Sequence, residues 1–293
     1  MRHSKGASGL MMLVVAGCSL PPPPRDGLQD GRHIKPARIV SLDFCADQFV
    51  LKLADRTHIA AVSPDAEASF SYMRVAAKGL PQVRPDAEAI IALAPDLVVR
   101  TYGGGPQLAA QLEQAGIKVH QIGWGEGFDA VRTHALETAK ALGEEARGAD
   151  MVAEFDRRLA AIKPAQGLTA LYVTPGGVTT GPGSMVDAMM ARAGLTNFQA
   201  TPGWSSLPLE RLTEARPDIL VTAFFTDQSS QQDYWSAARN PMIGDLTRSI
   251  PVVRLEGATT ACGGWFMMDA MEAMAKTGRE AHGQSKRLNG SMP

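Results

Sequence analysis

Cysteine, histidine and serine side chains are the groups of this chain that could perform covalent or metal chemistry. The six histidines form neither an HExxH motif nor a pair spaced i, i+4. The three cysteines include no C-x-x-C pair, which argues against a zinc ribbon or a thioredoxin-like site. Ser184 lies in a Gly-Pro-Gly-Ser-Met stretch that lacks the second glycine of a nucleophile elbow. Since these residues assemble no active site, we expect a protein that is not an enzyme.

Charge and composition exclude two further classes of protein. Lys and Arg total 29 against 30 Asp and Glu, so the net charge of −1 does not provide the positive field that nucleic-acid binders use. Hydrophobic residues make up 45% and charged residues 20%, which is typical of a globular protein and not of a disordered one. At roughly 150 residues per domain, the length indicates about two domains.

The first 36 residues are predicted to be a targeting signal and a tether, both outside the folded domain. A basic start precedes the apolar run 10–16, which is typical of a secretory signal and far shorter than the ~20 residues of a membrane-spanning helix. The run leads into Val-Ala-Gly-Cys, which resembles the cleavage box of bacterial lipoproteins. Residues 1–17 are therefore predicted to be a lipoprotein signal peptide and Cys18 the lipidated residue, with an ordinary signal peptide as the alternative. Four consecutive prolines follow, so residues 18–36 are predicted to be a lipid-anchored, extended tether.

The rest of the chain repeats one pattern of elements. Residues 88–99 contain a glutamate, a two-turn helix, a Pro-Asp pair and an apolar strand, and residues 210–221 contain the same series. Proline ends a helix, and a short β-branched run after it is typical of a buried parallel strand. Strands that alternate with helices in two similar halves predict an α/β fold of two Rossmann-like lobes with parallel sheets.

Two successive helices are predicted between the halves, at residues 128–142 and 144–162. The second carries small and apolar residues at helical spacing and is expected to bridge the lobes. We therefore predict an N-terminal α/β lobe at 37–142, a long bridging α-helix at 143–164 and a C-terminal α/β lobe at 165–287.

These features together resemble the periplasmic substrate-binding proteins of ABC importers for iron complexes and vitamin B12. The resemblance covers about residues 38–281. Its most specific segments are Arg38-Ile-Val-Ser-Leu, residues 88–99, Gly116-Ile-Lys-Val, and Trp204 followed by Glu210. It implies the class III architecture of periplasmic binding proteins, with two lobes joined by a long helix. It also implies a monomer in the periplasm, lipid-anchored to the cell envelope, whose partners are an ABC permease dimer with its ATPase.

The resemblance assigns a docking role to two glutamates. In the family, one glutamate on each lobe enters arginine pockets of the two-fold symmetric permease, and Glu88 and Glu210 stand at those positions. Matching places in two repeats also put two carboxylates on one face, which suits a symmetric partner with basic pockets. The alternative is that each glutamate only stabilises the N-terminus of its helix.

The ligand is expected between the lobes, against loops at the carboxyl ends of the strands. Trp204 matches a tryptophan that lines the cleft in the family's B12-binding member, and Tyr102 lies near another aromatic position of the family. Trp265 follows the last strand and is expected to face the cleft. Aromatic walls suit a planar or chelated ligand, so we expect a metal chelate such as cobalamin or a ferric siderophore, and no cofactor. The alternative for these side chains is ordinary packing.

The first and last loops set this chain apart from that member. The first loop contains Phe44 and Cys45, the last contains Cys262, and both are expected to face the cleft from opposite lobes as ligand-binding residues. The cysteines could be independent thiols, a disulfide across the cleft, or thiolate ligands of a metal. The last possibility leaves an alternative function open, a metal-site protein (metallochaperone or enzyme) that uses both cysteines. Beyond Arg254 the second lobe offers few arginines for a highly anionic siderophore, which favours a corrinoid.

Overall fold

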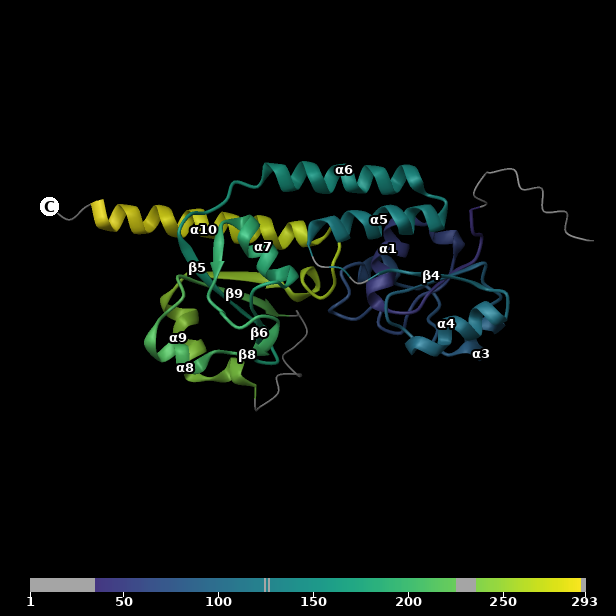
Figure 1. Cartoon of the computed structure of the whole chain (residues 1–293), viewed down its shortest axis with the longest axis horizontal. Helices are drawn as coiled ribbons and strands as arrows, with labels where there is room; N and C mark the ends of the chain where they lie inside the picture. Colours follow the sequence, from purple (N-terminus) through teal and green to yellow (C-terminus); the bar gives the residue numbers. More distant parts are fainter. Residues whose placement is uncertain (1–34, 124, 126, 225–235, 291–293) are drawn as a thin grey trace, which may run out of the picture. The chain divides into compact units, whose positions relative to one another are not determined.

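The computed structural model describes residues 35–123, 125, 127–224 and 236–290. The predicted signal peptide, Cys18 and the predicted tether up to residue 34 lie outside the described residues. No helix within those ranges combines the length and the apolarity that crossing a bilayer requires. The described residues form two lobes, each built on a parallel β-sheet, and a long helix, α6, that connects them (Figure 1).

The N-terminal lobe has a four-stranded parallel sheet in the order β2-β1-β3-β4. Its strands are β1 (Ile39–Ser41), β2 (Ile59–Ala61), β3 (Leu97–Arg100) and β4 (Lys118–Gln121). Its helices are α1 (Phe44–Leu53), α2 (Arg74–Ala77), α3 (Ala87–Ala92), α4 (Gly105–Gln114) and α5 (Phe128–Leu142). Because side chains alternate along a strand, Ile39 packs with α1 and α5 on one face, whereas Val40 packs with α3 and α4 on the other.

The C-terminal lobe repeats this architecture. Its strands are β5 (Leu168–Val173), β7 (Leu195–Asn197), β9 (Ile219–Phe224) and β10 (Val252–Glu256), and its helices are α7 (Met185–Ala193), α8 (Leu209–Glu214), α9 (Pro241–Ser249) and α10 (Met267–Gly290). The sheet order is β10-β9-β5-β7. Numbered within each lobe, both sheets therefore have the strand order 2-1-3-4. The two lobes with parallel sheets agree with the prediction from the sequence. An additional antiparallel pair joins β6 (Val178–Thr180) to β8 (Trp204–Ser206).

The repeated Pro-Asp pair makes equivalent contacts in the two lobes. Asp96 precedes β3, and its carboxylate accepts hydrogen bonds from the backbone N–H groups of Ala37 (2.9 Å) and Arg38 (3.0 Å), just before β1. Asp218 precedes β9, and its carboxylate accepts from the backbone N–H (2.7 Å) and the hydroxyl (2.8 Å) of Thr169 in β5. Each aspartate thus ties together the amino ends of the two central strands of its sheet.

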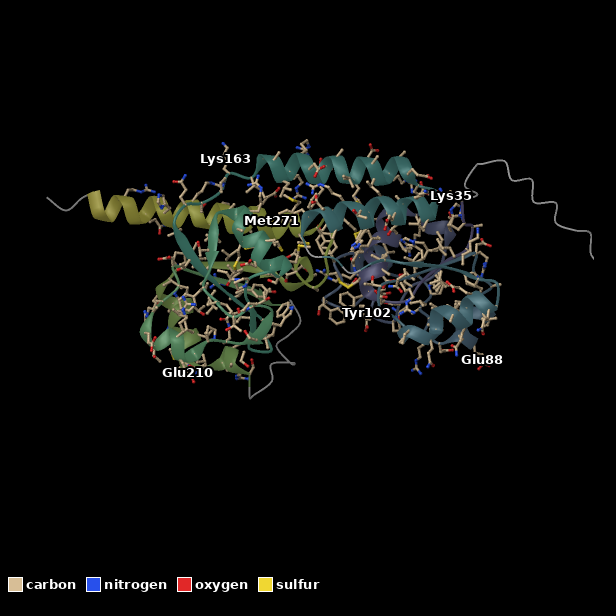
Figure 2. All side chains as sticks on the ribbon, in the orientation of Figure 1. Lys35, Glu88, Tyr102, Lys163, Glu210 and Met271 are labelled. Atoms are coloured by element: carbon tan, nitrogen blue, oxygen red, sulfur yellow. A yellow bond between two sulfur atoms is a disulfide. The ribbon has the colours of Figure 1, made fainter. Side chains whose placement is uncertain are left out.

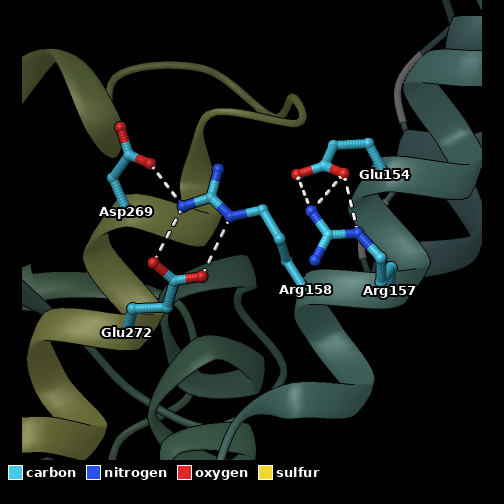
Figure 3. Close-up of polar contacts among 5 residues, drawn as sticks. All are labelled: Glu154, Arg157, Arg158, Asp269 and Glu272. Carbon is cyan, nitrogen blue, oxygen red and sulfur yellow. Dashed lines mark hydrogen bonds and ion pairs between the residues drawn. The ribbon is translucent and has the colours of Figure 1, made fainter.

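The bridging helix α6 (Glu145–Ala161) is attached to both lobes. Close packing on α5 depends on Gly148, because a Cβ at this position would lie 2.3 Å from the Cβ of Ala139. Near its other end, Arg158 donates to both carboxylate oxygens of Glu272 in α10 (2.9 Å each) and to Asp269 (2.7 Å) (Figure 3). Two parallel N–H···O bonds fix the direction of a guanidinium, so this contact holds α6 in register with α10.

A candidate ligand-binding cleft between the lobes

A cavity of about 430 Å³ lies between the two lobes. The N-terminal lobe lines it with α1, with the loops that follow β3 and β4, and with His134 of α5. The C-terminal lobe lines it with the start of α7, with β8, with residues 260–263 and with Met267 at the start of α10. The strands β1 and β3 are neighbours in the sheet, yet their connections leave to opposite faces, which makes this the topological switch point where open α/β sheets bind ligands. The volume lies in the range of roughly 300 to 1,000 Å³ that is usual for small-molecule sites.

Five of the six predicted ligand-binding residues meet at this cavity. The N-terminal lobe contributes Phe44, Cys45 and Tyr102, and the C-terminal lobe contributes Trp204 and Cys262. Their contact with a ligand stays a prediction, since position alone does not test it.

Trp265, the sixth predicted ligand-binding residue, is not among the residues that line this cavity. Its ring packs edge-to-face against Phe49 (5.6 Å between centroids) and Phe266 (5.2 Å), and it touches the apolar cores of both lobes. The chain passes through a turn at Gly263 and Gly264 before α10 begins, which directs Trp265 away from the cavity and onto α1. It lines a second cavity of about 300 Å³ that the bridging helix covers.

Tyr102 is held on a rigid loop by the buried carboxylate of Asp43. One carboxylate oxygen accepts the backbone N–H groups of Thr101 (2.7 Å), Tyr102 (3.0 Å) and Gly103 (2.9 Å). The other oxygen accepts the N–H of Ala46 (2.9 Å) and so caps α1. A carboxylate that accepts several backbone N–H groups satisfies donors that would otherwise be orphaned. The loop after β3 and the start of α1 are therefore positioned by one side chain.

Hydrogen bonds to its backbone carbonyl groups also hold this loop in place. Arg100, which is 5% exposed, donates to the carbonyls of Gly105 (2.7 Å) and Tyr102 (3.3 Å). Gly103 is required here, since a Cβ would lie 2.5 Å from the carbonyl oxygen of Leu42. Tyr102 nevertheless lines the cavity, and 42% of the residue as a whole is exposed. Burial of the hydroxyl, followed by the charge of Asp43, raises its pKa above the usual value, so the phenol is neutral at physiological pH.

Trp204 presents a large apolar surface from the other lobe, with 60% of the residue exposed. It begins β8, pairs with Thr180 in β6, and meets Tyr172 edge-to-face with the ring centroids 6.3 Å apart. Gly181 permits this arrangement because a Cβ there would lie 1.9 Å from the carbonyl oxygen of Thr201. An exposed tryptophan on a supported ribbon, in the wall of a cavity, is the geometry of a stacking platform.

A disulfide joins Cys45 to Cys262 across the cleft, with the α-carbons 5.7 Å apart. Of the three states that the sequence leaves open, the structure contains the disulfide. Both sulfur atoms are then covalently bonded, and neither is a thiolate that could hold a metal ion. Among the described residues, no group of three or more His, Cys, Asp or Glu side chains is arranged to hold a metal ion.

The sequence analysis misses His134, Met185 and Met189, which also line the cavity. Burial lowers the pKa of the His134 imidazole, which favours its neutral form. The two methionines stand one helical turn apart directly after the glycine-rich segment 176–183, and this spacing is a signal that could have identified them. None of the described residues that line the cavity is Asp, Glu, Lys or Arg.

Glu88 and Glu210 occupy equivalent places in the two lobes. Each is exposed and is the second residue of its short helix, α3 or α8. Figure 2 shows both at the lower edge of the view, one on each lobe, with Tyr102 between them. Both glutamates therefore lie on the same side of the part of the chain that the structure describes. Their contact with a permease stays a prediction.

The family described as "Periplasmic binding protein" matches residues 39–233, which includes β1 to β9 and the bridging helix. This chain belongs to the periplasmic binding protein family. Its members are binding proteins and not enzymes, in agreement with the expectation from the sequence, and membership implies a periplasmic or other extracytoplasmic location. A relative named "Cobalamin-binding protein", matched in two strains of Halobacterium salinarum, is 29% identical over 206 residues. That match covers 66% of this chain and spans 56% of the relative's own length.

Solved structures of periplasmic binding proteins share the fold. A periplasmic heme binding protein from Pseudomonas aeruginosa has a TM-score of 0.67 at 22% identity, and the alignment covers 84% of this chain and 93% of that one. The periplasmic heme-binding protein RhuT from Roseiflexus has a TM-score of 0.66 at 23% identity over 83% and 98% of the two chains. The vitamin B12 binding protein BtuF of Vibrio cholerae has a TM-score of 0.58 at 16% identity over 84% and 98%. At these identities the likeness establishes the architecture, and the two-lobed class III fold with its bridging helix is that of this family.

Proposed function

We propose that this protein is the substrate-binding lipoprotein of an ABC importer. It captures a metal chelate, either cobalamin (or another corrinoid) or a ferric siderophore, between its lobes and delivers it to the permease. The observation that carries the proposal is the cavity. It lies at a topological switch point, and exposed aromatic side chains of both lobes line it. The chain that forms it belongs to the periplasmic binding protein family. No covalent chemistry is involved, because the cargo leaves the cleft as it entered.

The chemistry of the cavity wall favours a corrinoid over a highly anionic siderophore. The wall combines aromatic rings with the thioethers of Met185, Met189 and Met267, and the described lining residues include no charged carboxylate, ammonium or guanidinium group. A trianionic catecholate complex needs arginine donors, whereas a corrin ring is bound by apolar contact and stacking. The name of the Halobacterium relative agrees with this preference.

The alternative function, a metal-site protein that uses Cys45 and Cys262, has less support. The disulfide consumes both thiols, and an oxidising periplasm preserves such a bond. His134 also lines the cavity, and its neutral imidazole is suited to coordinate the metal ion of a bound chelate or to hydrogen-bond to a polar edge of that chelate.

Delivery is proposed to use Glu88 and Glu210. The two exposed carboxylates are repeated in matching helices, and ion pairs with basic pockets of a symmetric permease are the contacts they are suited to make. The lipid anchor at Cys18 is part of the same proposal, because a tethered protein stays close to the membrane that holds its permease.

The proposal is tested by titrating the full chain, with Cys18 changed to serine, against cobalamin, cobinamide, haem and several ferric siderophores. Saturable quenching of tryptophan fluorescence, confirmed by calorimetry, is expected with a corrinoid. Trp204→Ala should weaken that affinity about tenfold through lost stacking, whereas Trp265→Phe, a tryptophan outside the cavity, is the matched control. Absence of binding by every compound would overturn the proposal.

A further inference from the structure

The disulfide is positioned to control the separation of the lobes. Cys45 is the second residue of α1 in the N-terminal lobe, and Cys262 lies between β10 and α10 in the C-terminal lobe, 217 residues later. We propose that the Cys45–Cys262 bond is a redox-sensitive clasp that limits how far the lobes part and thereby sets the rate at which cargo leaves the cleft. The statement about cargo rests on the proposed function, whereas the statement about lobe separation does not.

Beside the disulfide, the lobes are held together by ring packing and by two polar contacts. Trp265 packs against Phe49 (5.6 Å between ring centroids), and Tyr72 stacks on Phe266 (4.8 Å). The polar contacts are partly exposed. Tyr72 donates its hydroxyl to Asp269 (2.8 Å), and Arg74 forms an ion pair with Glu256, in which the two side chains are 26% and 35% exposed. Ion pairs that water reaches hold little free energy and exchange readily. A covalent bond with the α-carbons 5.7 Å apart does not open at all while it is intact. Unlike the ring packing and the polar contacts, the intact disulfide therefore sets a fixed limit to lobe separation at this point.

A reductant can reach the bond from the cleft. Both cysteines line the cavity and are partly exposed, and the neighbouring Gly263 is exposed. A protein dithiol of the thioredoxin class would supply the two electrons. One of its thiolates attacks a sulfur of the bond and releases the other cysteine, and its second thiol then displaces the mixed disulfide. The protein ends with two thiols and the reductant with one disulfide, so atoms and electrons balance.

Cargo and redox state should influence each other in both directions. Both cysteines line the cavity, so cargo that is bound there shields the disulfide from a dithiol. Thermodynamic linkage requires that a state which binds cargo more tightly is itself stabilised by cargo. Bound cargo is therefore expected to slow the reduction of the disulfide.

The test uses the full chain with Cys18 changed to serine, so that Cys45 and Cys262 are the only cysteines. Small-angle X-ray scattering without cargo compares the radius of gyration of the oxidised and the reduced protein, and an increase on reduction is expected. Stopped-flow measurements then follow the release of cobalamin and, separately, of a ferric siderophore. Reduction is expected to raise the release rate about tenfold, because a change in lobe freedom acts mainly on dissociation.

Two variants make the comparison specific. Cys45→Ser combined with Cys262→Ser should release cargo at the fast rate with or without reductant. Arg74→Gln removes a non-covalent contact between the lobes but keeps the bond, and it should release cargo at the slow rate until reductant is added. If the double variant fails to fold, reduction of the parent protein gives the same comparison.

The outcomes separate the clasp from the proposed function. Unchanged scattering, together with release rates that agree within about twofold, would overturn the clasp and leave the binding function standing. If neither probe binds, the proposed choice of cargo fails, and scattering alone decides whether the bond limits lobe separation.

Discussion

The side chain of Asp43 connects the start of α1 to the loop that carries Tyr102 into the cleft. Its two oxygens accept four backbone N–H groups, and it is 4% exposed. Each buried N–H group that loses its acceptor lowers the free energy of unfolding by about 1–3 kcal/mol. The effects of neighbouring groups are rarely additive. The residue thus affects stability and cargo binding through the same contacts.

Asp43→Asn is expected to lower the free energy of unfolding by about 2–3 kcal/mol, because an amide nitrogen would replace one of the two accepting oxygens and face an N–H group in either orientation. Cargo affinity should fall with it, since Tyr102 would lose its fixed position. Urea denaturation and ligand titration measure the two effects. Asp86→Asn, at the exposed N-cap of α3, is the control and should leave the affinity unchanged.

Asp47 is a buried residue whose ionisation makes stability depend on pH. It is fully buried, and desolvation raises its pKa to about 6, although the hydroxyl and N–H of Ser63 donate to it (2.5 and 3.2 Å). The unfolded chain releases this proton near pH 4, whereas the folded protein releases it near pH 6. The contribution of Asp47 to the free energy of unfolding is therefore expected to fall as the pH rises from about 4 to about 6.

Asp47→Asn should remove this dependence. The variant and the parent are expected to be equally stable below pH 4, and the variant more stable by about 3 kcal/mol at most above pH 7. Urea midpoints measured across this range test the expectation. Parallel pH profiles of the two proteins would contradict it.

At the scale of elements, the contact between α5 and α6 depends on one glycine. Glycine is normally unfavourable inside a helix, where alanine is better by about 1 kcal/mol. At Gly148, however, a Cβ would lie 2.3 Å from the Cβ of Ala139, so the bridging helix could not keep its place.

Gly148→Ala is expected to lower the free energy of unfolding by about 1–3 kcal/mol through overpacking, in spite of the gain in helix propensity. Gly283→Ala in α10 is the matched control, because the nearest atom to its added Cβ would be a flexible arginine tip at 3.9 Å. That control should be neutral or slightly stabilising. Equal effects of the two substitutions in thermal denaturation would refute the packing argument.

Elements with local signals could be predicted from the sequence, and pairings between distant segments could not. The Glu-helix-Pro-Asp-strand series predicts α3, α8 and the strands after them, since proline and β-branched runs act locally. The antiparallel pair of β6 and β8 is missed, because its strands are short and the first lies among glycines. The Cys45–Cys262 bond and the inward packing of Trp265 depend on how the last loop turns between lobes, which spacing along the chain does not encode.

At the scale of the whole molecule, docking and cargo binding are expected to be separable. Glu88→Ala combined with Glu210→Ala should abolish transport at normal protein levels and leave cargo affinity unchanged, because both residues lie outside the cavity lining. Growth on limiting cargo and a titration of the purified protein measure the two effects. Glu113→Ala combined with Glu280→Ala, two other exposed glutamates, is the matched control. Unimpaired transport by the first variant would refute the docking role.

The aspartate ties at the amino ends of the central strands also bear on how such a protein can evolve. Asp96 and Asp218 secure each sheet at one end, whereas the loops that line the cavity leave from the other. Substitutions in those loops therefore leave the anchoring of both sheets intact. After a gene duplication, one copy can acquire a new cargo specificity through substitutions in the loops at the carboxyl ends of its strands. The contacts at the amino ends then preserve the fold in both copies.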